Sequence, residues 1–295
     1  MKTILVGVDL SPESEHAVAH ALDLARREGA KVVLAMADCV PELPAHLAAG
    51  SREVAASYTE ELQRRLAADR VTLGELRERW SGGVDLSQVI VDGFADEELP
   101  RVGSEICADL IVVGSRGRTG VRRWLLGSVA ERVVRRAEQS VLVARGDAVP
   151  GGYRRVVIGT DFSPLADAAI ARALAVLSPQ LRVDLVHCWQ VPWAGTMDVP
   201  LVANEELRAQ LEAALRDAGD KLRAGLRDLG RPEPELHIHL VQGSAAQGLV
   251  SVATDQHAEL VVVGSHGRRG VRRFMLGSVA EVTVRHAPCS VLVGR

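Results

Sequence analysis

The chain has 295 residues, enough for two domains of about 150 residues that each bury their own core. Hydrophobic residues make up 47% and charged residues 25%, the globular average, which excludes a disordered chain or a fibre as the main architecture. The 35 basic and 38 acidic residues leave a net charge of −3, too small for general binding to nucleic acid or to an anionic membrane.

The first half of the chain alternates short apolar runs with helical segments. We expect strands at 4–8, 31–37, 84–91, 110–113 and 140–144, and helices at 12–28, 51–80, 96–107 and 127–137. Because the strands are apolar throughout, they indicate a parallel sheet covered on both faces and joined by right-handed crossovers. Pro100 falls inside the third helix and predicts a kink or a late start there.

The second half repeats the first. The segment IVVGSRGRTGVRRWLLGSVAERVVRRAEQSVLVAR (111–145) recurs as VVVGSHGRRGVRRFMLGSVAEVTVRHAPCSVLVGR (261–295), with about two positions in three identical. A repeat of this length is a duplicated domain, and Pro150-Gly151-Gly152 breaks any regular element at the joint. We therefore expect two tandem doubly wound α/β domains, 1–147 and 148–295, each with a five-stranded, mostly parallel sheet and helices on both faces.

The cysteines and the N-terminus indicate the compartment. Cys39, Cys107, Cys188 and Cys289 lie far apart without a C-x-x-C pair, which argues against a disulfide framework or a cysteine zinc site. The first apolar run stops at Asp9, too soon for a signal peptide, and no stretch reaches the roughly eighteen apolar residues of a membrane span. We expect a soluble, cytoplasmic protein.

Polar residues follow the first strand of each half, where an open parallel sheet binds its ligands. Asp9 and Asp161 end these strands, and Ser11-Pro12 and Ser163-Pro164 then begin helices. An isolated pattern of this kind is better explained by helix capping than by a ligand.

The fourth strand of each half leads into a glycine motif. Gly114 and Gly117 are followed after nine residues by Gly127-Ser128, and the other half has Gly264, Gly267 and Gly277-Ser278. Glycines let backbone amides approach an anion, and the next helix directs its free N–H groups and positive dipole end at the same place. The intervening loops carry several arginines and no acid, which favours a polyphosphate. Alternatively, Ser128-Val-Ala-Glu131 and Ser278-Val-Ala-Glu281 are capping boxes, but recurrence of the whole constellation favours a nucleotide.

With this motif, its strand context and the Asp after the first strand, the chain resembles a tandem universal stress protein of the ATP-binding branch, over nearly all of both halves. The resemblance implies ATP with Mg²⁺ in two pseudo-equivalent sites. It implies that Asp9 and Asp161 flank the adenosine and that the backbone at Ala37 and Cys188 contacts adenine. The ribose and phosphates would be held by Gly114, Gly117, Gly127, Ser128 and Val129, and by Gly264, Gly267, Gly277, Ser278 and Val279.

The resemblance also implies that the last strands, 141–145 and 291–295, pair with each other, so that one chain is equivalent to a dimer of single domains. Whole chains could then form a further homodimer. Three functions stay open: a nucleotide-dependent stress-response regulator, a slow adenine-nucleotide hydrolase or transferase in which Asp9 or Asp161 orients a water, and a ligand-free interaction module. The motifs offer no evident general base over a γ-phosphate, which favours the regulator.

Several other residues have simpler explanations than a ligand site. His16 and His20 lie one helical turn apart without a third ligand, so an exposed helix face is expected. His237 and His239 share one face of a strand, which an edge position explains. Trp124 and Phe274 occupy matching places in the two glycine loops and are expected to anchor those loops to the core.

Overall fold

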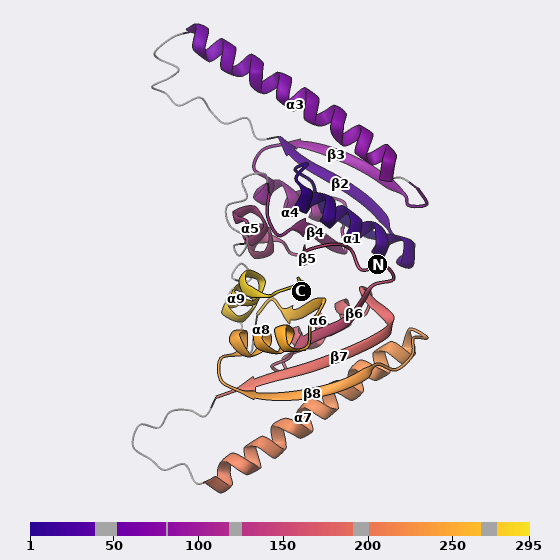
Figure 1. Ribbon diagram of the computed structural model, residues 1–295, viewed down its shortest axis with the longest axis vertical. Helices are drawn as coiled ribbons and strands as arrows, with labels where there is room; N and C mark the ends of the chain where they lie inside the picture. Colours follow the sequence, from indigo (N-terminus) through magenta and orange to yellow (C-terminus); the bar gives the residue numbers. More distant parts are fainter. Residues whose placement is uncertain (39–51, 81, 118–125, 191–200, 267–275) are drawn as a thin grey trace.

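The computed structural model describes residues 1–38, 52–80, 82–117, 126–190, 201–266 and 276–295, with side chains throughout except at 52–55 and 201–204. The first half contains β1 (Thr3–Gly7), α1 (Pro12–Glu28), β2 (Lys31–Asp38), α3 (Arg52–Trp80), β3 (Leu86–Asp92), α4 (Ala95–Glu105), β4 (Leu110–Gly114), α5 (Ser128–Arg136) and β5 (Ser140–Ala144). The second half contains β6 (Tyr153–Gly159), α6 (Pro164–Ala173), β7 (Leu177–Trp189), α7 (Leu201–Asp228), β8 (Glu235–Gln242), α8 (Ala245–Asp255), β9 (Leu260–Gly264), α9 (Ser278–His286) and β10 (Ser290–Gly294) (Figure 1).

The strands form one ten-stranded sheet in the order β3-β2-β1-β4-β5-β10-β9-β6-β7-β8. Within each half all neighbouring strands are parallel, and the order reverses between the first and fourth strands. The halves meet where β5 pairs antiparallel with β10, with Leu142 opposite Leu292. The expected doubly wound fold and the expected pairing of the last strands are both confirmed.

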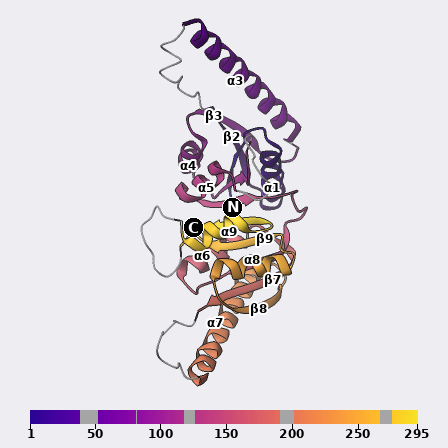
Figure 2. The ribbon, with the colours of Figure 1, turned by 60° about the vertical axis from the view of Figure 1, so that its left-hand side comes forward.

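Helices cover both faces of the sheet (Figure 2). One core cluster packs α1, α3, α6 and α7 against one face, and it includes Ile4, Leu73, Leu142, Leu215 and Leu292. The other cluster packs α4, α5, α8 and α9 against the opposite face, and it includes Leu5, Leu99, Val133, Leu249 and Val291. Successive strand residues therefore enter opposite cores, as the continuous apolar runs predict. Within the described residues, no helix is long and apolar enough to cross a membrane.

The late start expected for α4 and the exposed face expected for His20 are both wrong, while the kink at Pro100 stays a prediction. α4 does not start late: it begins at Ala95 and runs through Pro100. Pro100 is the sixth residue of the helix, so its missing N–H removes one hydrogen bond close to an end where the first four amides lack intrahelical partners anyway. His20 is not on an exposed helix face, because it is only 6% exposed and lies against Gly146 and Tyr153 from the segment that joins the halves. His237 and His239 do lie on an edge strand, β8.

Candidate functional site

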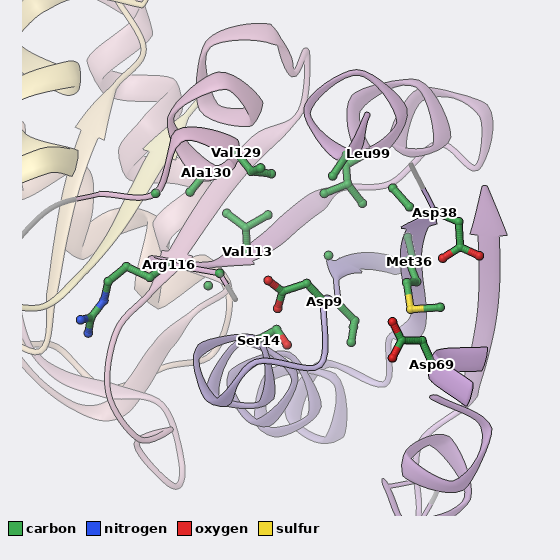
Figure 3. Close-up of a pocket in the computed structure, with 18 of the residues that line it drawn as sticks. Asp9, Ser14, Met36, Asp38, Asp69, Leu99, Val113, Arg116, Val129 and Ala130 are labelled. Carbon is green, nitrogen blue, oxygen red and sulfur yellow. The ribbon is translucent and has the colours of Figure 1, made fainter. Parts of the chain in front are cut away.

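A cavity of about 600 Å³ opens at the carboxyl ends of β1 and β4, where the strand order of the first half reverses. This is the position at which open parallel sheets bind ligands. Figure 3 shows Asp9 in the middle of the cavity, with Val113 from β4, Met36 from β2 and Ala130 from α5 around it. All seven candidate residues of the first half line this one cavity: Asp9, Ala37, Gly114, Gly117, Gly127, Ser128 and Val129.

Asp9 is held in place by the turn into α1. Its Oδ1 accepts hydrogen bonds from the Ser11 amide at 3.1 Å and from the Ser11 hydroxyl at 2.5 Å. Ser11 in turn caps α1, since its Oγ accepts from the Ser14 amide at 3.2 Å. The capping explanation is therefore correct for Ser11. It does not remove Asp9 from the site, because the turn fixes this carboxylate against the cavity.

The glycines of the first motif have packing roles of their own. A Cβ on Gly114 would lie 2.7 Å from the carbonyl oxygen of Glu13, so a side chain would separate the loop from α1. A Cβ on Gly117 would lie 2.5 Å from Oδ2 of Asp9. The sequence suggested that these glycines let amides approach an anion; the structure shows that they also let the loop after β4 lie directly on Asp9 and on the first turn of α1.

The start of α5 differs from the expected capping box. The N-cap is Gly127, which has no side chain, so Ser128 is the first helical residue rather than the cap. Glu131 is turned away: its Oε1 accepts from Arg285 of the other half at 3.1 Å. No side-chain hydrogen bond caps this helix end within the described residues. The first amides of α5 therefore keep their hydrogen-bonding capacity and their partial positive charge at the cavity wall.

Charge is distributed unevenly along the cavity. Arg116 lies at one end, where Nη2 is 3.3 Å from Glu13 Oε1, while Asp38 and Asp69 lie at the other (Figure 3). The remaining arginines of the first loop (118, 122 and 123), the arginines of the second loop, and Trp124, Phe274, Cys39 and Gly267 lie outside the described residues. Among the residues that the structure describes, no group of three or more His, Cys, Asp or Glu side chains is placed to hold a metal ion by itself.

Several lining residues were missed by sequence reasoning. They come from β2, α3 and α4, and they are Met36, Asp38, Tyr58, Leu62, Arg65, Leu66, Asp69, Ala95 and Leu99. Met36 and Asp38 could have been found, because they flank Ala37 at the end of β2. The α3 residues carry no such signal, since leucines spaced by four are typical of any helix packed on a sheet.

The second half repeats the local geometry. Asp161 Oδ1 accepts from the Ser163 amide at 3.1 Å, and Ser163 caps α6 through the Ala166 amide. Gly277 is the N-cap of α9, and no side chain in the described part of the chain caps this helix, so Ser278 and Val279 begin it as Ser128 and Val129 begin α5. Gly264 ends β9 beside β6, so it lies next to the strand that precedes Asp161.

The end of β7 in the second half carries different side chains from the end of β2 in the first half. His187 stands where the first half has Met36; its Nδ1 donates to the Thr160 carbonyl at 2.8 Å, and its ring lies 4.5 Å from that of Phe162. Cys188, the counterpart of Ala37, donates its thiol to the Ala245 carbonyl at 3.6 Å. Burial raises the pKa of Cys188 to about 11, which keeps this thiol protonated and unreactive near neutral pH.

Fold and cavity together define a tandem doubly wound α/β protein with a ligand-sized cavity at the switch point of its first half. The chain matches the universal stress protein family over residues 1–145 and 152–295. A universal stress protein of Mycolicibacterium smegmatis is 31% identical over 306 residues, covering 99% of this chain and 96% of the relative. One from Mycobacterium tuberculosis is 34% identical over 195 residues, an alignment that spans 64% of this chain and only 62% of that relative.

Among solved structures, a universal stress protein from Archaeoglobus fulgidus has the same fold, with a TM-score of 0.68, 20% identity, and coverage of 99% of this chain and 98% of that one. This chain therefore belongs to the universal stress protein family.

Proposed function

We propose that this protein binds ATP, with Mg²⁺, in two pseudo-equivalent sites within 1–147 and 148–295, and acts as a nucleotide-dependent regulator of the cytoplasmic stress response. One observation carries the proposal: the first turn of α5, which no side chain of the described residues caps, lies in the wall of the cavity that gathers all seven candidate residues of the first half. Free backbone N–H groups at a helix N-terminus form a favourable site for phosphate.

The cavity supports one orientation of the nucleotide. The phosphates would lie against the amides of Ser128 and Val129 and beside Gly114 and Gly117, the ribose would lie near Asp9, and the adenine would meet the backbone at Ala37. Mg²⁺ usually keeps several waters and takes one or two carboxylates in addition to the phosphates. Asp9 provides a carboxylate beside Gly117, which fits a metal that enters with the nucleotide.

The first test is direct identification of the bound molecule. The purified full-length chain would be denatured and the released nucleotide identified by chromatography and mass spectrometry, with calorimetric titration of added Mg-ATP. We expect ATP or ADP approaching two per chain. If no nucleotide is released and calorimetry detects no binding of Mg-ATP, the proposal is rejected and the ligand-free interaction module remains.

A second test removes one amide from the proposed phosphate site. Proline is favoured at the first position of a helix, and this chain already uses it there in α1 and α6. Gly127 has φ −66° and ψ 142°, a conformation suited to a residue before proline. Ser128→Pro should therefore preserve α5 but remove one hydrogen bond to a charged oxygen, weakening ATP binding at that site by about ten- to a hundredfold.

Ser128→Ala is the matched control, because it removes the hydroxyl and keeps the amide. Ser278→Pro makes the same change in the second half, where Gly277 has φ −63° and ψ 145°. If calorimetry gives the same ATP affinities for both proline variants and for the natural chain, the helix amides do not bind the phosphates.

A further inference from the structure

In one described segment of α3, all the partly buried side chains line the cavity. In the stretch 56–72, which is fully described, Leu62, Leu66 and Asp69 are partly covered and every other side chain is exposed. These three are spaced by four and three residues, so they share one face of the helix. All three line the cavity, as does Tyr58 one turn earlier, which is 44% exposed.

An ion pair fixes this segment to the sheet. Arg70, on α3, donates from Nε at 3.0 Å and from Nη2 at 2.9 Å to Oδ2 of Asp38, the last residue of β2. Asp38 is 4% exposed, and it lines the same cavity as Asp69, the neighbour of Arg70 in the helix. The pair holds the face of α3 that carries Leu62 and Leu66 at the carboxyl end of β2, where Ala37 and Asp38 line the cavity.

The two ends of the cavity suit the two ends of a nucleotide. The α5 amides offer donors and partial positive charge at one end, where Arg116 is paired with Glu13. The other end combines the carboxylates of Asp38 and Asp69 (Figure 3) with Arg65 of α3 and with apolar surface from Met36, Leu62 and Leu66. A planar, uncharged heteroaromatic base with an exocyclic amino group matches that end, because its faces are apolar and its amino group donates to carboxylates.

We propose that α3 forms the base-binding wall of the first site, with Tyr58, Leu62 and Leu66 covering one face of the base and Arg70–Asp38 acting as a positioning pair. This inference rests on the proposed nucleotide function. It also separates the two sites, because the strand register places Trp189 of β7 where β2 has Asp38. The corresponding ion pair is therefore confined to the first half.

The test separates contacts with the base from contacts with the phosphates. Adenosine, Mg-ATP and tripolyphosphate would be titrated by calorimetry into full-length chains in the Ser278→Pro background, which weakens the second site for the two phosphate ligands. For adenosine, each variant is compared with the same background, because the second site then contributes equally to both titrations. Leu62→Ala plus Leu66→Ala should weaken the binding of adenosine and of ATP by the same factor, on the order of tenfold, because less apolar area is buried. The affinity for tripolyphosphate should stay unchanged. Val71→Ala is the matched control: Val71 is an apolar residue of α3 that is 62% exposed and does not line the cavity.

The positioning pair has its own readout. Arg70→Gln should weaken the binding of adenosine but not that of tripolyphosphate, and it should speed amide hydrogen exchange in 56–72. Arg70→Lys should partly restore the adenosine affinity and the slower exchange. Failure of the natural chain to bind ATP would reject the nucleotide function itself. If ATP binds but the double alanine variant keeps the affinity of the natural chain for adenosine, or loses tripolyphosphate equally, the base-wall inference is wrong and the function stands.

Discussion

His20 is a titratable side chain buried between the halves. Its Nε2 lies 3.2 Å from the Gly146 carbonyl, which can only accept, so this nitrogen carries the proton and Nδ1 accepts from the Tyr153 hydroxyl at 3.0 Å. The imidazole also stacks on the Tyr153 ring, with centroids 5.5 Å apart. Burial lowers the pKa of His20 below its ordinary value of 6.5, because the charged form loses its hydration.

This lowered pKa predicts acid sensitivity of the fold. Below about pH 6.5 the unfolded chain binds a proton that folded His20 resists, so the free energy of unfolding should fall as pH drops, until the pH passes the lowered pKa. His20→Gln should flatten that part of the profile. Urea denaturation between about pH 7.5 and pH 5 would measure it. An unchanged slope in His20→Gln would contradict the assignment.

At the scale of residues, the sequence predicted those cavity-lining residues that lie directly beside the end of a strand. Asp9, Gly114 and Gly117 could be placed this way, because the carboxyl ends of β1 and β4 are adjacent in this sheet. Leu62 and Leu66 could not, because whether a helical leucine faces the core or a cavity depends on where the helix crosses the sheet. The burial of His20 was missed for the same reason: its partners lie 126 and 133 residues away.

At the scale of elements, arginines from the opposite half cap the C-terminal ends of α5 and α9. Arg145, just after β5, donates to the carbonyls of Val284 and Ala287 at the end of α9. Arg295, just after β10, donates to the Val134 carbonyl of α5 at 2.6 Å. Burial lowers the pKa of both guanidinium groups. Helix C-termini leave carbonyls without intrahelical partners and favour cations. Each arginine therefore supplies donors and a positive charge to the last carbonyls of a helix in the opposite half.

Removing these arginines should destabilise the seam between the halves. Arg145→Ala and Arg295→Ala each leave partly buried carbonyls without a donor, and we expect each to lower the free energy of unfolding by about 1 to 3 kcal/mol in urea denaturation. Arg285→Ala is the control at the same seam. It removes a partly exposed ion pair with Glu131, for which at most about 1 kcal/mol is expected. Equal small effects for all three variants would show that the carbonyl contacts contribute little.

Element boundaries followed from sequence where a capping residue marks them. α1 spans Pro12–Glu28 as expected, because Ser11 caps its start and Gly29, with φ 64°, ends it. The expected helix 127–137 began one residue early, because Gly127 is the N-cap and α5 starts at Ser128; the alternative of a capping box at Ser128 is wrong. The carboxylate of Glu131 is used by Arg285, and a partner from another domain leaves no trace in the local sequence.

For the whole molecule, the two halves share one sheet and both of its cores. The β5–β10 pair joins the halves at the centre, and the cluster that contains Leu73 also contains Leu222. Side chains of α1 cross the joint as well: Arg27 donates to the Leu177 carbonyl at 3.1 Å, and Glu28 pairs with Arg231 at 2.7 Å. The duplication and the strand pairing were predictable from the repeat and the family resemblance. The crossing contacts were not, because they join positions that have no periodic relation.

A shared core predicts that the chain unfolds as one cooperative unit. Leu73→Ala in the first half and Leu222→Ala in the second remove fully buried side chains, 0% and 1% exposed, and each should cost about 2 to 5 kcal/mol. In native-state hydrogen exchange, each variant should lower the opening free energy of β1 and β6 by the same amount, since local stability in a cooperative unit equals the global value. Leu207→Ala, on the exposed part of α7, should change both by less than about 0.5 kcal/mol. A Leu73→Ala effect confined to β1 would instead show that the two halves unfold independently despite their common sheet.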